Sequence, residues 1–361
     1  MPARWSSWFR PRLDWLQIEV TTNCPAACVY CPRTVYRRFW QRRHMDLDTL
    51  QLLCGTFSNC GMVYLQGWGE PLTHPGLFEM VRTAKTAGCK VGMTTNGMGM
   101  EEETCTRLVR EGVDVIAFSL AGTDEQSDAL RRGTRFCEVA EALRTLERTK
   151  RLLGTTRPAI HLAYLLLQSR WREVPELPAL MRRLNVEYAV ISTLDFVAAP
   201  ALAAEAILPG TREAYEAARA KLEEVAQAAR RVGLSIHYWL ASPPETEAEE
   251  YAFNTGSGIG LSWLVARGPT CTENVHRSAF VSADGAVSPC VYAAVPATGA
   301  TYVVSGTERS YTRMSFGNIH DTPFETIWRS KPYAAFRAAH RRGDLPERCR
   351  DCPRPRMIRA G

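Results

Sequence analysis

The chain has 361 residues, of which 45% are hydrophobic, and a formal net charge of +6. This length and composition are typical of a large globular domain with a smaller second one, and they argue against a disordered chain. No stretch approaches the roughly 20 apolar residues of a membrane-spanning helix, and the N-terminal segment lacks the apolar centre of a signal peptide. We therefore expect a cytoplasmic protein that contacts no membrane and, with so small an excess of positive charge, no nucleic acid.

Short apolar runs and amphipathic segments alternate through the first 200 residues. The apolar runs predict six strands, and the helical periodicity predicts helices between them. The strands are expected at 16–20, 62–66, 90–94, 113–120, 159–167 and 187–191, and the helices at 75–87, 101–111, 136–153 and 174–184. Repeated βαβ units of this kind indicate a parallel sheet covered by helices. We predict an α/β core over residues 1–200, a partial (β/α)6 TIM barrel with its active site at the carboxyl ends of the strands.

The pattern changes after residue 200. A long helix at 211–232, a short strand at 234–239 and a Pro- and Gly-containing loop at 241–268 indicate a helical bridge and linker over residues 201–268. Residues 269–361 are expected to form a separate α+β domain. Its features are a hairpin that turns at Asp284-Gly285 and a mainly helical segment at 324–341.

The segment directly after the first predicted strand contains three closely spaced cysteines, Cys24, Cys28 and Cys31. One short loop can present three thiolates to a 4Fe–4S cluster, and the fourth iron then stays open to bind a small molecule. A zinc site usually has four ligands, and no fourth cysteine lies nearby. A disulfide framework belongs to small domains of oxidising compartments. The spacing therefore predicts an iron–sulfur cluster.

A second set of four cysteines lies in the C-terminal region: Cys271, Cys290, Cys349 and Cys352. Four thiolates make a closed site, which is either a fully ligated 4Fe–4S cluster or a structural zinc. Their spacing alone slightly favours zinc, whereas the N-terminal motif favours a second, auxiliary iron–sulfur cluster. The other five cysteines lie on or beside apolar elements. Since free cysteine is often a small core residue, we assign no chemistry to Cys54, Cys60, Cys89, Cys105 and Cys137.

With these motifs the chain resembles the radical S-adenosylmethionine (SAM) superfamily over roughly residues 14–195. Gly67-Trp68-Gly69-Glu70-Pro71 is similar to the Gly-Gly-Glu-Pro motif that receives the SAM amino group, with Trp68 in place of the first glycine. The family pattern implies further contacts to the adenine, ribose and carboxylate of SAM. The implied SAM-binding residues are Tyr30, Trp68, Gly69, Glu70, Asn96, Ser119 and Arg132. A surface carboxylate at a strand end is the alternative interpretation of Glu70, and ordinary strand-end and helix-start positions are the alternative for Ser119 and Arg132.

The C-terminal cysteines resemble the SPASM/twitch auxiliary-cluster domains of the same superfamily. Cys271 is followed by Gly285 and Cys290 at the spacing of the SPASM opening, but Ile358 stands where a further SPASM cysteine is expected. The resemblance therefore implies a twitch-type single cluster. The strongest likeness within the group is to SPASM proteins proposed as maturases of tungsten-cofactor oxidoreductases, through the segments 66–72, 284–290 and 315–319.

The resemblance implies an oxidoreductase-like or maturase-like enzyme that cleaves SAM reductively to a 5′-deoxyadenosyl radical. The radical abstracts hydrogen from a peptide or protein, or acts while a metalloenzyme is matured, and the electron comes from a donor such as flavodoxin or ferredoxin. Two alternatives stay open: a twitch-type dehydrogenase of a small alcohol, and a non-catalytic iron–sulfur or zinc scaffold. The basic run Arg33–Arg43 is either a holder of an acidic substrate or a solvated helix face. The sequence identifies neither the substrate nor a catalytic acid or base.

Overall fold

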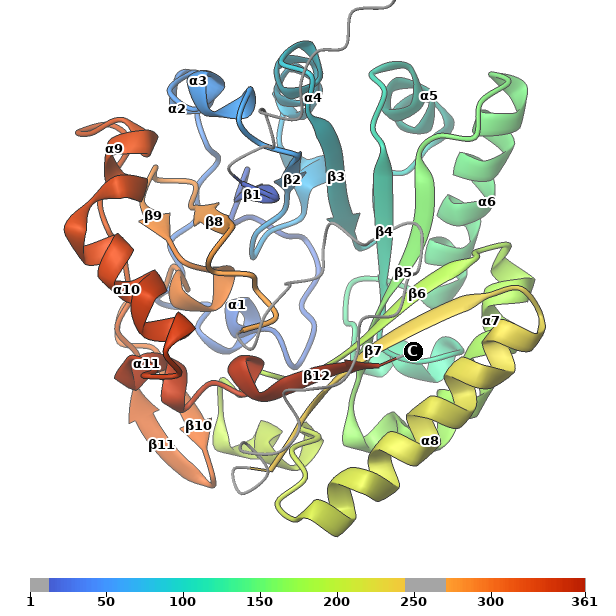
Figure 1. Cartoon of the computed structure of the whole chain (residues 1–361). Helices are drawn as coiled ribbons and strands as arrows, with labels where there is room; N and C mark the ends of the chain where they lie inside the picture. The colour runs from blue at the N-terminus through green and yellow to red at the C-terminus, as the bar shows by residue number, and fades with distance from the viewer. Residues whose placement is uncertain (1–12, 244–270, 361) are drawn as a thin grey trace, which may run out of the picture.

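The computed structural model describes residues 13–243 and 271–360 (Figure 1). Most of the loop predicted at 241–268 lies outside these ranges.

A ten-stranded sheet organises the fold, in the order β12-β7-β6-β5-β4-β3-β2-β1-β8-β9. The eight central strands, from β7 through β1 to β8 in this order, are parallel to their neighbours. At the two edges, β12 is antiparallel to β7 and β9 is antiparallel to β8. The strands are β1 (Trp15–Ile18), β2 (Met62–Leu65), β3 (Lys90–Thr95), β4 (Val115–Leu120), β5 (Ala159–Leu166), β6 (Tyr188–Thr193), β7 (Ser235–Ala241), β8 (Ser278–Val281), β9 (Val287–Ser288) and β12 (Met357–Ala360). The first six strands confirm the predicted partial (β/α)6 barrel.

Helices cover the outer face of the curved sheet (Figure 1). The main ones are α4 (Leu77–Thr86), α5 (Glu102–Arg110), α6 (Phe136–Leu152), α7 (Leu177–Leu184) and α8 (Arg212–Arg231). Helix α4 shows why they pack there: Leu77, Met80, Val81 and Ala84 recur at helical spacing and are buried. Strand β5 alternates between fully buried residues and half-buried ones, so one face joins the core and the other faces the barrel interior.

Residues 201–243, expected as part of a bridge, continue the β/α alternation. Helix α8 packs against β7, and β7 pairs in parallel with β6, with Tyr188 opposite Ser235. The sheet therefore extends by one strand beyond the six that the apolar runs predict.

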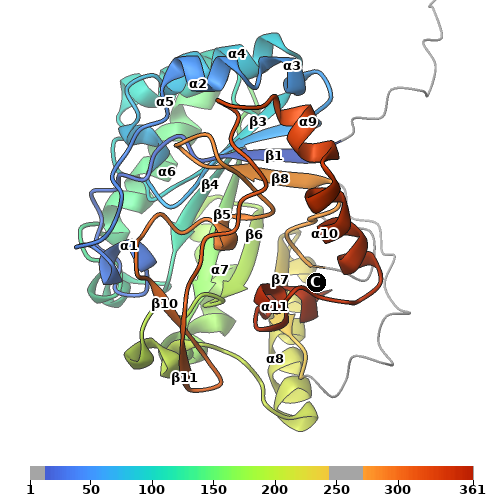
Figure 2. The same cartoon turned by 90° about the vertical axis from the view of Figure 1, so that its left-hand side faces the viewer.

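The C-terminal domain pairs with both edges of the parallel sheet. Strand β8 adds to β1, with Leu16 opposite Ala279, and β12 adds to β7. Figure 2 shows the orange and red segments passing from the β8 side to β7. The predicted hairpin is present as β8 and β9. Its turn requires Gly285, which has φ of +81°, and a Cβ there would lie 2.8 Å from Asn318 Oδ1.

The rest of the C-terminal domain consists of short elements. They are β10 (Thr301–Val304), β11 (Thr307–Ser310), α9 (Phe324–Arg329), α10 (Lys331–Arg341) and α11 (Glu347–Arg350). The helical segment predicted at 324–341 is two helices, because Ser330 caps the start of α10 and Pro332 occupies its first turn. Across the described ranges, no helix is long and apolar enough to span a membrane.

Candidate functional site: two cysteine sets at the barrel mouth

The first cysteine set lies on the loop that leaves β1. Backbone hydrogen bonds hold this loop against residues 130–132: Ala27 N–H donates to the Arg132 carbonyl at 2.6 Å, and Val29 N–H donates to the Leu130 carbonyl at 2.9 Å. Its three cysteines, Cys24, Cys28 and Cys31, are free and partly buried.

These thiols interact with one another electrostatically. The pKa of Cys31 is raised to about 12, chiefly by burial, and the charges of Cys28 and Cys24 contribute to this rise. Three thiolates this close together need a compensating positive charge, which the irons of a cluster supply while they deprotonate the thiols. The donor set of this loop therefore fits the cluster that the spacing predicts.

Glu70 stands beside this loop, after β2. Its side chain is only 3% exposed, and burial raises the pKa of its carboxyl to about 7. Three groups donate hydrogen bonds to it: the backbone N–H of Asn96 at 2.7 Å, the Thr95 hydroxyl at 2.9 Å and the backbone N–H of Leu72 at 3.2 Å. Glu70 thus joins the turn after β2 to the end of β3. It is not a free surface carboxylate.

Asn96 connects Glu70 to the cysteine loop. Its side-chain nitrogen lies 3.6 Å from Cys24 Sγ, and its side-chain oxygen accepts the backbone N–H of Met98 at 2.9 Å. The structure therefore brings together three of the residues singled out in the sequence, Cys24, Glu70 and Asn96, from three different loops.

The two glycines before Glu70 permit a close chain crossing. A Cβ at Gly69 would lie 2.4 Å from the Thr21 carbonyl oxygen, and one at Gly67 would lie 2.3 Å from Glu19 Cγ. Trp68, between them, is absent from the described non-glycine residues with positive φ, so its backbone accommodates the side chain without strain.

The Trp68 ring reaches the C-terminal domain. Its indole N–H donates to the Val291 carbonyl at 3.2 Å, and its ring makes edge contacts with Phe196 and Tyr292, with centroids 6.2 and 6.0 Å apart. Its backbone N–H donates to Glu19 Oε1 at 2.9 Å. Trp68 therefore links the predicted SAM-binding turn to the residues that follow Cys290.

The other predicted SAM-binding residues, Tyr30, Ser119 and Arg132, differ in how deeply they are buried. Tyr30 packs in a hydrophobic cluster around Leu167, and burial raises its pKa. Ser119 is half-buried near the end of β4, whereas the side chain of Arg132 is exposed.

Of the two neighbouring arginines, Arg131 and Arg132, it is Arg131 that is buried, with 3% of its surface exposed. Arg131 was not among the residues predicted from the sequence to bind SAM. It donates to the Ser119 carbonyl, and its charge partly offsets the rise that burial causes in the pKa of both Tyr30 and Glu70. No signal in the sequence distinguishes it from its neighbour, because both arginines stand in the same loop.

The four C-terminal cysteines converge in a second place. Burial raises the pKa of Cys271 well above its usual range, and the charges of Cys352 and Cys290 add to this. Burial likewise raises the pKa of Cys290 well above its usual range, and the charges of Glu273, Cys352 and Cys349 contribute to this rise. The four thiols, from residues as far apart as 271 and 352, therefore fit a shared cluster with positive irons. Among the described residues, no three His, Cys, Asp or Glu side chains are grouped around the position of a single metal ion.

A buried ion-pair network adjoins this second set. Arg354 pairs with Asp195 at 2.6 Å and with Glu273 at 3.2 Å, and it donates to the Tyr292 hydroxyl at 2.6 Å. Asp195 follows β6, so the network ties the barrel to the cysteine set of the C-terminal domain. Arg354 could not be identified from the sequence, because its partners Asp195 and Glu273 are 159 and 81 residues away along the chain.

Comparison with known proteins assigns the chain to a family. The model of the radical SAM superfamily matches residues 18–162, and the model of the SPASM iron–sulfur cluster-binding domain matches residues 271–353. These two matches contain the first and the second cysteine set, respectively.

Two curated relatives align over most of the chain. A tungsten-containing aldehyde ferredoxin oxidoreductase cofactor-modifying protein from Pyrococcus furiosus is 26% identical over 347 residues, which cover 94% of this chain and 87% of that protein. A PqqA peptide cyclase from Gluconobacter oxydans is 24% identical, with coverage of 94% and 82%.

Solved structures show the same fold. Streptococcus suis SuiB bound to the precursor peptide SuiA has a TM-score of 0.62 at 13% identity, covering 95% of this chain and 70% of that one. Native anSMEcpe with bound AdoMet has a TM-score of 0.63 at 16% identity, covering 94% of this chain and 88% of that one. The family uses a 4Fe–4S cluster and SAM in its barrel, and its SPASM domain binds additional iron–sulfur. The chain belongs to the radical SAM superfamily and is one of its enzymes that carry a C-terminal SPASM domain.

Proposed function

We propose that this enzyme modifies a peptide or protein, either a precursor peptide or a metalloenzyme that it helps to mature. The observation that carries the proposal is the similarity over 94% of the chain to relatives named as a cofactor-modifying protein and a peptide cyclase. That share of the chain is far larger than the radical SAM match at residues 18–162, so the similarity concerns the combination of barrel and auxiliary domain rather than the barrel alone.

The proposed cluster ligands are the two cysteine sets. Cys24, Cys28 and Cys31 hold the cluster that binds SAM, and Cys271, Cys290, Cys349 and Cys352 hold the auxiliary one. When bound and reduced, the first cluster with SAM supplies a 5′-deoxyadenosyl radical that abstracts hydrogen from the substrate.

The chain's own residues bind and orient SAM. Glu70, with the backbone of Trp68 and Gly69, receives the SAM amino group, and Tyr30 packs near the adenine. Asn96, Ser119 and Arg132 line the remainder of the site, and the buried charge of Arg131 beside Glu70 adds an attraction for the SAM carboxylate. The electron comes from a protein donor such as flavodoxin or ferredoxin. The proposed setting is the reducing cytoplasm, which suits twelve cysteines that are all free thiols.

Anaerobic SAM cleavage tests the proposal first. The reconstituted protein, with dithionite and SAM, should form 5′-deoxyadenosine, and a Cys24/Cys28/Cys31→Ala triple variant should not. Absence of product from a protein that binds SAM and contains a full cluster, with candidate substrates present, would favour the scaffold alternative.

The substrate class needs a second experiment. Peptides and oxidoreductases encoded beside the gene should be incubated with enzyme, SAM and dithionite, and examined by mass spectrometry for a mass change that requires the first cysteine set. Oxidation of small alcohols or cyclitols, with every peptide and protein unchanged, would overturn the proposed substrate class.

A further inference from the structure

An exposed group of arginines lies beside the cysteine loop. Arg37, Arg38, Arg42 and Arg43 are all exposed, and none of them forms an ion pair with another described residue. Phe39, in the middle of the group, has 60% of its surface exposed. We name residues 37–43 the arginine platform. Unpaired charges of one sign around an exposed aromatic ring are typical of a surface that meets a partner.

The platform is held in a fixed position relative to Cys24. The Thr22 hydroxyl donates to the Gln41 carbonyl at 2.7 Å and accepts the backbone N–H of Arg43 at 2.8 Å. The Trp40 indole N–H donates to the Thr22 carbonyl at 3.0 Å. Since Thr22 is two residues from Cys24, these bonds tie the platform directly to the start of the cysteine loop.

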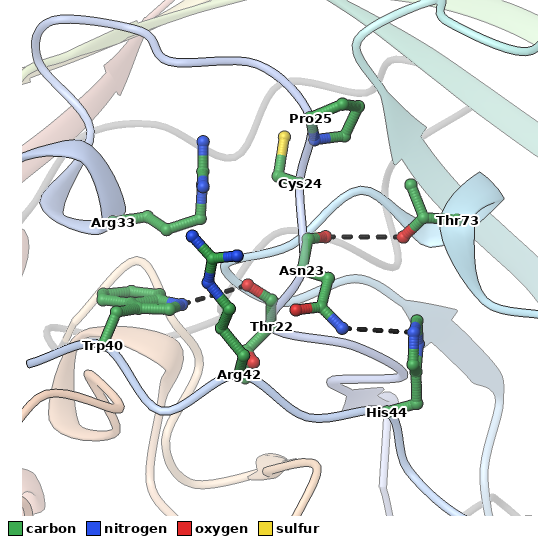
Figure 3. A pocket seen from close by; sticks show the side chains of 9 residues that line it. All are labelled: Thr22, Asn23, Cys24, Pro25, Arg33, Trp40, Arg42, His44 and Thr73. Atoms are coloured by element: carbon green, nitrogen blue, oxygen red, sulfur yellow. Dashed lines mark hydrogen bonds between the residues drawn. The ribbon is translucent and has the colours of Figure 1, made fainter. Parts of the chain in front are cut away.

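A cavity of about 320 Å³ connects the platform to Cys24. Arg33, Arg42, His44 and Cys24 are among its lining residues, and Figure 3 shows the two arginines on the same side of the Cys24 sulfur. The positive surface therefore reaches Cys24, a proposed ligand of the first cluster, so a partner seated on the platform would lie beside the cysteine loop.

We propose that the arginine platform docks a small acidic electron-transfer protein, which reduces the cluster held by Cys24, Cys28 and Cys31. This proposal rests on the proposed function. The carrier loses one electron and the cluster gains one, so the step needs no further reactant. Charge complementarity speeds such encounters and makes them sensitive to salt, and short-lived redox complexes need only small interfaces.

A charge-reversal pair tests the proposal. Arg37→Glu/Arg38→Glu alters two platform residues that do not line the cavity beside Cys24. Arg212→Glu/Arg231→Glu, on the exposed surface of α8, makes the same change in net charge and serves as the control. Flavodoxin in its two-electron-reduced form is the carrier. Two quantities are measured anaerobically at low salt: the second-order rate of flavodoxin oxidation by each reconstituted protein, and flavodoxin binding to each by titration.

We expect the platform variant to oxidise flavodoxin at least 10-fold more slowly than wild type and to bind it more weakly. The control variant should resemble wild type, and added KCl should slow wild type toward the platform variant. Equal rates for all three proteins would overturn the proposal. The proposal would also be wrong if the platform variant oxidised flavodoxin at the wild-type rate but no longer bound single-stranded DNA that wild type binds.

Cleavage of SAM with dithionite separates this proposal from the proposed function, because dithionite needs no docking surface. Wild type and both variants should form 5′-deoxyadenosine equally with dithionite. If the platform variant loses that activity as well, the platform serves SAM or substrate binding and the docking proposal is wrong. If wild type itself forms none even with candidate substrates present, the proposed function fails, whereas flavodoxin oxidation still tests the docking surface.

Discussion

The Glu70 carboxylate accepts the backbone N–H of Asn96 at 2.7 Å, and the side chain of Asn96 in turn lies 3.6 Å from Cys24 Sγ. The proposed SAM-binding carboxylate is therefore part of the structure that positions the first cluster ligand. Removing the whole side chain would disturb both functions, and a charge-neutral replacement of the same shape is the more informative change.

Glu70→Gln should weaken SAM binding about 10- to 100-fold, the range expected from losing one hydrogen bond to a charged partner. The iron content should stay at the wild-type value, because the amide oxygen still accepts a backbone N–H. Equilibrium dialysis of radiolabelled SAM against the reconstituted protein measures this. Glu70→Asp, which retains the charge on a shorter side chain, is the comparison. Unchanged SAM affinity in Glu70→Gln would remove Glu70 from the SAM site.

The two cysteine sets should lose iron independently. Wild type should hold about eight irons per chain after anaerobic reconstitution. The triple Cys24/Cys28/Cys31→Ala variant should hold about four, and so should Cys290→Ala. Cys137→Ala, at an exposed position outside both sets, should leave the content unchanged. About four irons in wild type would leave the second set to zinc or empty, and about twelve would require ligands beyond these seven cysteines.

Arg354→Met should destabilise the protein by roughly 3 to 5 kcal/mol, because it leaves the buried carboxylate of Asp195 and the largely buried one of Glu273 without this positive partner. Arg309→Ala provides the contrast: its pair with Asp351 is half-exposed at the arginine, and its loss should cost at most about 1 kcal/mol. Unfolding in urea under anaerobic conditions measures both. Equal and small effects would mean that the Arg354 network does not tie the two domains together.

Glu19 predicts a specific dependence of stability on pH. Burial raises the pKa of its carboxyl from 4.5 to about 7, although Trp68 and Ala283 donate backbone hydrogen bonds to it. The folded protein therefore retains this proton between pH 4.5 and 7 while the unfolded chain releases it. The stabilisation is complete below pH 4.5 and is lost as the pH rises through about 7.

Glu19→Gln should remove this part of the pH dependence. Between pH 5 and 7.5, the free energy of unfolding of wild type should fall relative to that of the variant, by about 3 kcal/mol at most. Glu103→Gln, at an exposed position on α5, is the control and should follow wild type. Parallel curves for wild type and Glu19→Gln would show that the Glu19 carboxyl titrates alike in the folded and unfolded states.

Much of the fold could be predicted because the sequence patterns that specify its strands and turns each span only a few residues. Apolar runs identified β1–β6, and Asp284-Gly285 identified the β8–β9 turn, since strand and turn preferences act over a few residues. The edges of the sheet could not be predicted. The pairing of β8 with β1 joins residues more than 260 positions apart, and no local preference selects such a partner.

The sequence by itself determined the chemistry of the centre. Three thiols within eight residues, and glycines on both sides of Trp68, are local patterns whose meaning survives without coordinates, because covalent spacing limits where those groups can be. Only the tertiary structure decided which groups surround that centre. It buried Arg131 and exposed Arg132, joined Glu19 and Trp68 to the C-terminal domain, and placed Arg354 between two distant carboxylates. The physical reason is that burial and ion pairing depend on chain segments far apart in sequence, and they arise only when those segments pack together.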